Sequence, residues 1–165
     1  MVIWSGDAID EAKQLFWTAV KELVDEKYDY KPIFSIDKYD RFCCLSASNE
    51  HVTLEDSNNK VMRIFVERLD EGLMDYKYGG GFFFEYNAKD ISEIIPVIDK
   101  SCQTLSYYGM DADELQKFVI DNGLRGCDRI VPVGKTMDLT FKWDGFDMID
   151  TMSRYVYAPS YLSLK

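Results

Sequence analysis

The side chains best suited to covalent chemistry in this sequence are its four cysteines, Cys43, Cys44, Cys102 and Cys127. A nucleophilic thiolate needs a positive microenvironment, such as a neighbouring histidine or a helix N-terminus. The sequence identifies no such group for Cys43 or Cys44. One hypothesis is a hydrolase or transferase that uses one of these two thiols. Because no activating group is identified, we favour the alternative that both pack in the core.

Metal and phosphate sites have characteristic spacings that this sequence lacks. A thiolate zinc site is built from a CxxC pair or a Cys/His cluster, but Cys43 and Cys44 are adjacent and His51 is the single histidine. We therefore expect no metal. The glycine triplet at 79–81 has neither the GxGxxG nor the GxxxxGK[ST] spacing and precedes a predicted strand. We interpret the triplet as a segment whose glycines provide backbone freedom or allow close packing.

Composition limits the class of protein. A chain of 165 residues with 47% hydrophobic and 15% aromatic residues buries enough surface for one domain. The formal charge of −10 opposes attraction to nucleic acid and to anionic lipid. No apolar run approaches the roughly 20 residues of a membrane span, and residue 1 is not followed by a basic region and an apolar stretch, so we expect neither a membrane span nor a signal peptide. The cysteine usage is typical of a reduced compartment, so we expect a cytoplasmic protein.

Helical and strand periodicities divide the N-terminal half of the chain into clear elements. Apolar residues of the stretch 8–27 recur at three- and four-residue spacings, which predicts an amphipathic helix. The predicted elements are a buried strand at 1–4, a turn and helix cap at 5–7, the helix to Lys27, a shorter helix at 36–47, a hairpin of 51–55 with 61–69, and a strand at 82–86.

Strands and helices continue to alternate in the C-terminal half. Asp111 and Glu114 have capping-box spacing and predict a helix that ends at Asn122-Gly123. The other predicted elements are a helix at 91–98 kinked or interrupted by Pro96, strands at 103–108 and 129–133, and a last helix at 146–155. The alternation predicts an α/β fold with a mostly parallel sheet flanked by helices.

Three separated blocks of sequence resemble a known family. They are QTLSYYG at 103–109, DRIVPVGKTMD at 128–138 and WDGFDMIDTMSRYV at 143–156. In this order they look like the C-terminal signature of the acyl-CoA reductases, which include the fatty-acid reductase of bacterial luminescence. VIWSGDAIDEAKQLFW at 2–17 is similar to the strand and helix that follow the nucleophilic cysteine loop in that family. The resemblance covers nearly the whole chain and implies an aldehyde-dehydrogenase-like catalytic domain.

The resemblance also implies a reaction and its cofactor. In the family a cysteine thiolate attacks an acyl-CoA thioester, CoA leaves, and NADPH reduces the acyl-enzyme to an aldehyde. The resemblance places that cysteine just before Val2 and the nucleotide-binding domain further upstream. No dinucleotide fingerprint and no ExFGP segment occurs in the sequence. We therefore expect residues 1–165 to be a single domain, the C-terminal catalytic-domain portion, with no catalytic residue, no NADPH bound to it alone and no activity in isolation.

Partners follow from the same resemblance. The complete enzyme would bind acyl-CoA, and this chain would associate with its N-terminal nucleotide-binding domain. An acyl-protein synthetase or an acyl-transferase is a further expected partner, and self-association is expected because homo-oligomers are usual in the superfamily. The alternative hypothesis is a stand-alone, non-catalytic interaction module derived from such a reductase.

Trp143, Asp144 and Asp147 lie in the most recognisable block. The resemblance places this late region near the acyl-binding side of the site, where the three residues would line the substrate tunnel or hold its walls. The alternative, which we favour, makes Trp143 a core residue and Asp144 or Asp147 the cap of the last helix, because Asp-Gly precedes an amphipathic run.

Gln103, Thr104 and Lys135 are the other candidate substrate-binding residues. Gln103 and Thr104 begin a predicted strand in the first block of the resemblance. Lys135 follows Gly134, and its charge would suit a phosphate of CoA or NADP. The alternative for Lys135 is a solvated surface lysine, which is the more common situation.

Overall fold

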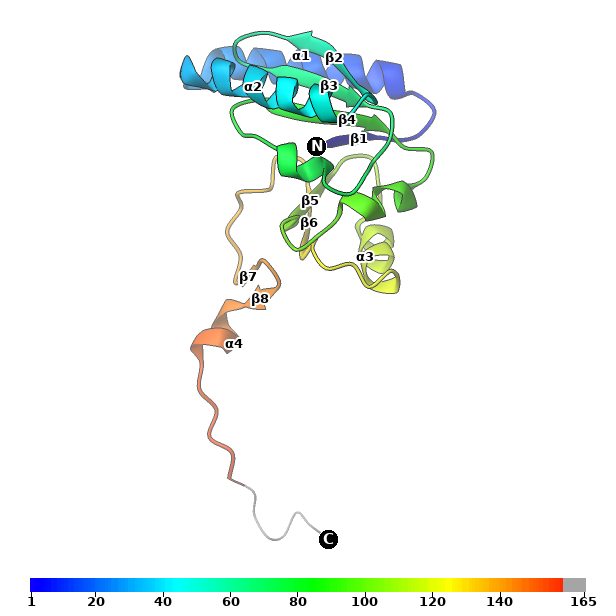
Figure 1. Cartoon of the computed structure of the whole chain (residues 1–165). Coiled ribbons are helices and arrows are strands. Elements are labelled where there is room, and N and C mark those ends of the chain that lie inside the picture. The colour runs from blue at the N-terminus through cyan, green and yellow to red at the C-terminus, as the bar shows by residue number, and fades with distance from the viewer. Residues whose placement is uncertain (159–165) are drawn as a thin grey trace. The chain divides into compact units, whose positions relative to one another are not determined.

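The computed structural model describes residues 1–158 and has a mixed α/β architecture, with a mostly parallel sheet flanked by helices (Figure 1). The chain divides into two compact units between Val97 and Ile98, and each unit is described by itself. The sequence-based expectation of a single domain stays a prediction. Within residues 1–158, no helix combines the length and the apolar character that crossing a membrane requires.

A four-stranded sheet forms the centre of the first unit. Its strands are β1 (Val2–Trp4), β2 (Val52–Ser57), β3 (Met62–Val66) and β4 (Phe82–Asn87), in the order β1-β4-β3-β2. β4 is parallel to both β1 and β3, and β2 is antiparallel to β3. The predicted hairpin is therefore confirmed, with a register shift between Leu54 and Asp56.

Helices α1 (Ile9–Lys27) and α2 (Ile33–Ser48) lie alongside these strands (Figure 1). The predicted first helix is confirmed, but the predicted cap at 5–7 is wrong. Ala8 occupies the N-cap position and makes no side-chain capping bond. Asp10 and Glu11 stand in the first turn, where negative charge interacts favourably with the helix dipole.

Trp17 anchors α1 to the sheet. It is buried in one cluster with Trp4 of β1 and Val61, and its ring meets Phe83 of β4 edge to face at 5.2 Å. Phe16 makes edge contacts with both tryptophans, at 5.4 Å from Trp4 and 5.0 Å from Trp17. Such aromatic pairs contribute beyond the apolar area they bury, so β1, α1 and β4 are joined by one aromatic core.

α2 buries one narrow face. Leu45 and Lys38 are its buried residues, seven positions apart and therefore on the same face. Cys43 and Cys44 fall off that face and are exposed, so the expectation that both pack in the core is wrong.

The glycine triplet brings main chains close together. A Cβ on Gly81 would lie 2.0 Å from the carbonyl oxygen of Lys60, and Gly81 has a φ of +84°. A Cβ on Gly80 would lie 3.1 Å from the Phe34 ring. Only glycine fits at position 81, which confirms close packing. Two 3₁₀ helices complete the first unit, η1 (Leu73–Tyr76) and η2 (Ile91–Val97), and η2 includes Pro96.

The second unit contains a parallel strand pair joined by a helix. Its elements are β5 (Thr104–Tyr107), α3 (Ala112–Asp121) and β6 (Arg129–Pro132). Asp111 caps α3 as predicted, because its carboxylate accepts hydrogen bonds from the backbone N–H groups of Asp113 and Glu114.

The last part of the described chain is a small hairpin followed by a short helix. Its elements are β7 (Lys142–Trp143), β8 (Phe146–Asp147) and α4 (Met148–Met152). α4 has five residues, so the predicted helix at 146–155 is too long. Its apolar side chains are exposed, and a short helix without a buried face gains little from further turns.

Candidate functional site

Arg129 is the residue around which the candidate positions of the second unit gather. It begins β6, is 8% exposed, and pairs in parallel register with Thr104 of β5. Its backbone N–H donates to the carbonyl oxygen of Gln103 at 3.1 Å. The parallel register thus places both predicted residues of the first sequence block beside an arginine of the second block.

The guanidinium of Arg129 holds two further segments. Nη1 donates to the carbonyl oxygen of Thr136 at 2.9 Å, and Nη2 donates to that of Asp138 at 3.1 Å. Its Cζ lies 4.1 Å from the ring centroid of Trp143, a cation–π contact. Gln103, Thr104, Arg129, Lys135 and Trp143 are called the Arg129 cluster below.

The charge of Arg129 has no acidic partner within residues 1–158, where no carboxylate oxygen lies within 4.0 Å of it. Carbonyl oxygens and an indole ring therefore stabilise this buried cation. Two of its five N–H donors are used in the contacts described, and the planar fork is suited to a carboxylate or phosphate.

The turn after β6 places Lys135 at the surface. Its backbone N–H donates to Pro132 O at 3.0 Å, and Gly134 supplies a φ of +87°. The Lys135 ammonium lies 3.1 Å from the Asp138 carboxylate, and its side chain is 61% exposed. This geometry is that of a solvated lysine with a surface ion pair, which contributes little to stability. Its contact with a phosphate stays a prediction.

The β7–β8 hairpin presents Trp143 to Arg129. Asp144, at the tip, has a left-handed φ of 48°, and a Cβ on Gly145 would lie 3.1 Å from Asp128. Asp147 caps α4, since its Oδ1 accepts hydrogen bonds from the N–H groups of Ile149 and Asp150. The structure thus gives Asp147 the capping role, while half-buried Trp143 covers a cation instead of joining an apolar core.

Sequence reasoning missed Arg129. The signal available was its place in the block 128–138, but a single arginine at the start of a β-branched strand is unremarkable. The parallel pairing of residues 104–107 with 129–132 creates the cluster, and sequence spacing does not specify that register.

A second buried charge, Glu85, lies in the first unit. It is 0% exposed, and its Oε2 accepts from the indole N–H groups of Trp4 at 2.8 Å and Trp17 at 2.9 Å. Its Oε1 accepts from Arg63 Nε at 2.6 Å, and the Arg63 guanidinium stacks 4.6 Å from the Trp17 ring. Because each carboxylate oxygen is hydrogen-bonded, this network has the character of a structural core rather than an open catalytic site.

Lys38 is the third buried charge of the described chain. Its Nζ donates to the carbonyl oxygen of Asn59 at 3.0 Å, and burial lowers the pKa of its ammonium group. Ser35 Oγ donates to the same carbonyl at 2.9 Å. The shared acceptor fixes the 58–61 turn against α2, which indicates a structural role.

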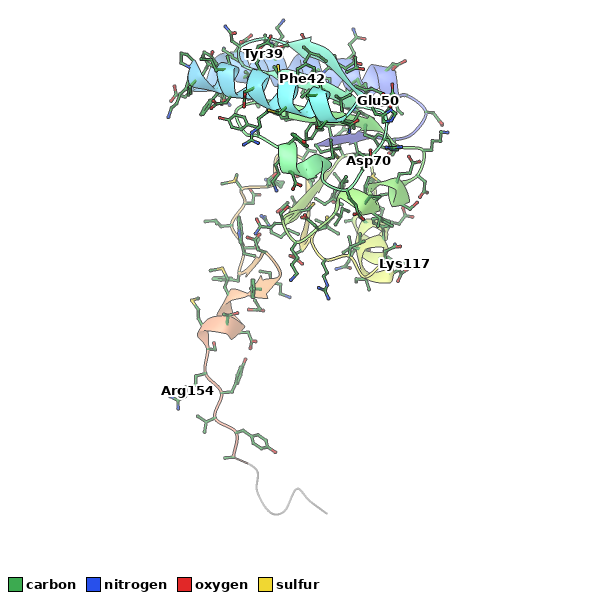
Figure 2. All side chains as sticks on the ribbon, in the orientation of Figure 1. Tyr39, Phe42, Glu50, Asp70, Lys117 and Arg154 are labelled. Carbon is green, nitrogen blue, oxygen red and sulfur yellow. The ribbon has the colours of Figure 1, made fainter. Side chains whose placement is uncertain are left out.

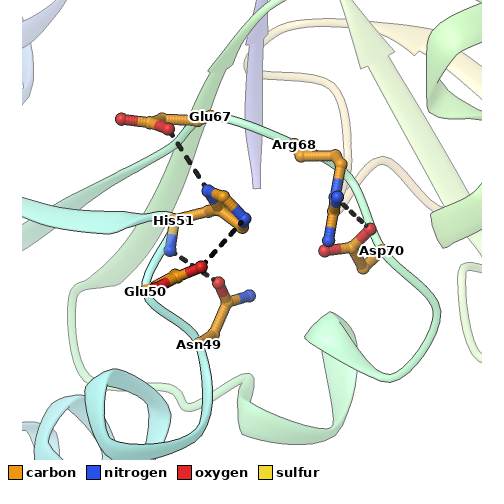
Figure 3. Close-up of polar contacts among 6 residues, drawn as sticks. All are labelled: Asn49, Glu50, His51, Glu67, Arg68 and Asp70. Atoms are coloured by element: carbon orange, nitrogen blue, oxygen red, sulfur yellow. Dashed lines mark hydrogen bonds and ion pairs between the residues drawn. The ribbon is translucent and has the colours of Figure 1, made fainter.

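His51 lies between two carboxylates on the turn from α2 to β2 (Figure 3). Its Nδ1 is 3.4 Å from Glu67 and its Nε2 is 3.9 Å from Glu50. Its backbone N–H donates to Asn49 Oδ1 at 2.8 Å. Within residues 1–158 these carboxylates are the ionic partners of its ring, so the structure gives no Cys–His pair for the hydrolase hypothesis.

The described surface includes two hollows of similar size. One, of about 380 Å³, is lined by residues 6–11 at the start of α1 and by Asn87. Its Asp7, Asp10 and Glu11 disfavour a phosphate ligand. The other, of about 340 Å³, lies along α3 and is lined in part by Cys127 and Asp128. No group of three or more potential metal ligands was found among residues 1–158.

Comparison with protein-family models gives no match, and comparison with curated proteins gives none either.

Proposed function

We propose that this chain is the C-terminal catalytic-domain portion of an NADPH-dependent acyl-CoA reductase, with an aldehyde-dehydrogenase-like fold. In this proposal it forms part of the wall around a fatty acyl thioester. The reaction it serves is reduction of that thioester to an aldehyde through a thioacyl-enzyme.

One observation carries the proposal. The three sequence blocks that resemble the reductase signature meet at Arg129. The first block supplies β5, the second supplies Arg129 and the 136–138 turn, and the third supplies Trp143. The backbone of Arg129 joins the first block, and its buried side chain joins the second and third, and this convergence supports the interpretation that the three blocks belong to one site.

Within the proposal, Arg129 is a positioning residue. It fixes Trp143 and the 136–138 turn, and thereby the shape of the wall they form. Its spare N–H donors and Lys135 would attract the phosphates of CoA. By the resemblance, the cysteine thiol and the NADPH-binding domain belong to another part of the enzyme. Self-association and contact with an acyl-protein synthetase or acyl-transferase are part of the same proposal.

The test begins with the gene. The coding frame upstream of Met1 is read, and the complete frame is expressed and assayed for NADPH oxidation and fatty aldehyde formation with tetradecanoyl-CoA. We expect a cysteine loop and a nucleotide-binding domain upstream, and activity that residues 1–165 alone lack. Trp143→Ala should lower kcat/KM about tenfold or more, because small displacements of a substrate wall are costly in rate.

Two matched variants accompany that assay. Trp143→Phe keeps an aromatic face for Arg129 and should retain most of the activity. Lys117→Gln removes a charge from the exposed side of α3 and should leave kcat/KM unchanged (Figure 2). A complete frame without the upstream domain, together with no aldehyde formation, would refute the reductase proposal and favour the non-catalytic interaction module.

A further inference from the structure

Cys102 and Cys127 face each other at the start of the β5–β6 pair. Their Sγ atoms are 3.5 Å apart, and the backbone N–H of Cys127 donates to the carbonyl oxygen of Cys102. The parallel register that pairs Thr104 with Arg129 places these two residues opposite each other when it is continued two positions back. Neighbouring strands are about 4.8 Å apart, within the Cα separation that a disulfide spans.

The main chain builds this approach. A Cβ on Gly126 would lie 2.1 Å from the carbonyl oxygen of Asp99, so the peptide before Cys127 packs directly on the turn that carries Cys102. That turn is closed by the N–H of Cys102 donating to Asp99 O at 3.0 Å. Cys127 itself has a left-handed φ of 58°. The packing of the main chain therefore brings the two cysteines close to each other.

The two sulfurs differ in their surroundings. Cys127 is 2% exposed, whereas Cys102 is half-buried. The hydrogen bond with Cys102, and then burial, raise the pKa of the Cys127 thiol, so Cys127 keeps its proton at neutral pH. Because Cys102 is the less buried of the two, it meets an oxidant first, and Cys127 is positioned to resolve the product.

We propose that Cys102 and Cys127 are a modification site that forms a reversible disulfide when the protein meets a hydroperoxide. This inference is independent of the proposed function. The deprotonated form of Cys102 attacks the peroxide, an S–O bond forms, the O–O bond breaks, and hydroxide leaves from hydrogen peroxide or alkoxide from an organic hydroperoxide. The Cys127 sulfur then attacks the sulfenic sulfur, an S–S bond forms, the S–O bond breaks, and water leaves with the Cys127 proton. Two thiols lose two electrons in total, and the peroxide gains them.

Closing the bond requires only a small movement. A disulfide has an S–S length of about 2.05 Å, so the sulfurs approach by about 1.5 Å, within reach of side-chain rotation. The bridge would close a loop that contains α3 and would tie the beginnings of β5 and β6 together, two residues before Arg129 and Thr104. Oxidation would therefore act on the β5–β6 strand pair, which positions the Arg129 cluster.

The chain carries its own control thiols. Cys43 and Cys44 are exposed on α2, and adjacent cysteines are unsuited to an ordinary disulfide with each other. The native chain is treated with stoichiometric hydrogen peroxide, alkylated with N-ethylmaleimide, unfolded, digested and examined by mass spectrometry. We expect a peptide pair joined through Cys102 and Cys127, lighter by about 2 Da than the two thiols and separated by dithiothreitol.

Variants separate this pair from general oxidation. Cys102→Ser should abolish the joined peptide and leave its partner sulfur unbridged, while the double variant Cys43→Ser/Cys44→Ser should form the joined peptide at the wild-type rate. The proposal is overturned if peroxide leaves Cys102 and Cys127 unjoined while Cys43 and Cys44 become oxidised. It is equally overturned if the bridge forms only after urea unfolding, since the native juxtaposition would then contribute nothing.

Discussion

Glu85→Gln keeps the size of a buried side chain while removing its charge. In the wild type, one oxygen of Glu85 accepts from two indole N–H groups and the other accepts from Arg63. The amide of glutamine has one oxygen, so its NH₂ group must face either Arg63 or both indoles. Either orientation sets donor against donor in a site that is 0% exposed.

The expected loss is large because an ionic partner disappears from a buried pair. Breaking such a pair costs about 3–5 kcal/mol, and we expect the free energy of unfolding of the first unit to fall by that amount. With a urea m-value of about 2 kcal/mol per molar, the midpoint should shift by about 2 M. Unfolding is followed by tryptophan fluorescence in a Trp143→Phe background, so that the signal comes from Trp4 and Trp17.

The double variant Arg63→Met/Glu85→Gln supplies the matched control. It removes both charges, keeps an amide oxygen that accepts from both indole N–H groups, and should be less destabilised than Glu85→Gln alone. A midpoint for Glu85→Gln within about 0.3 M of the wild type would refute the reasoning, because the charge would then contribute little. So would a double variant that is less stable than the single one.

Two further perturbations follow from the first unit. Gly81→Ala should lower the free energy of unfolding by about 2 kcal/mol or more, because its Cβ would clash with the Lys60 carbonyl and its backbone would be strained. Gly79→Ala is the control: its Cβ would have open space, so its free energy of unfolding in the same urea assay should stay within about 0.5 kcal/mol of the wild type. Glu93 accepts a hydrogen bond from the Tyr86 hydroxyl and others from the N–H groups of Lys89 and Asp90, which lower the pKa of its carboxyl group. Glu93 therefore stabilises the folded state above the pKa of its carboxyl group in the unfolded chain, about 4.3, and this stabilisation is lost as pH falls through the lower pKa of the folded state. Glu93→Gln should consequently make the urea midpoint fall less steeply between about pH 5 and 3. If the urea midpoint of that variant falls as steeply as that of the wild type, other carboxylates and not Glu93 cause the loss of stability at low pH.

The elements that the sequence predicted well are those with strong local signals. The long apolar stripe of α1, the Asp111 cap of α3 and the aromatic strand β4 each depend on neighbours within a few residues. The errors arose where local signals were weak or misleading. The last helix has the right apolar spacing but no surface to bury it within the described residues, and spacing alone does not supply that surface.

The buried charges were the least predictable feature. Arg129 and Glu85 look like ordinary strand residues in the sequence, because the register that pairs β5 with β6, or β3 with β4, is a long-range property. Two positions of the candidate site, Gln103 and Thr104, were named from resemblance, and their neighbour Arg129 became evident from the strand pairing. The role of Asp147 as a cap was predictable because it depends on the two residues that follow it.

The hydrogen bond from Trp4 to Glu85 joins residues that are 81 positions apart, and it has a consequence for how the chain is made. At a synthesis rate of about 5–20 residues per second, β1 waits roughly 4–16 s for β4 to be translated. During that interval its backbone groups and the two indoles have no native acceptor on β4. Of the four strands of this sheet, β1 is therefore translated first but is among the last to be paired, and the nascent chain meanwhile exposes an aromatic segment that favours chaperone contact and slow, non-local completion of the sheet.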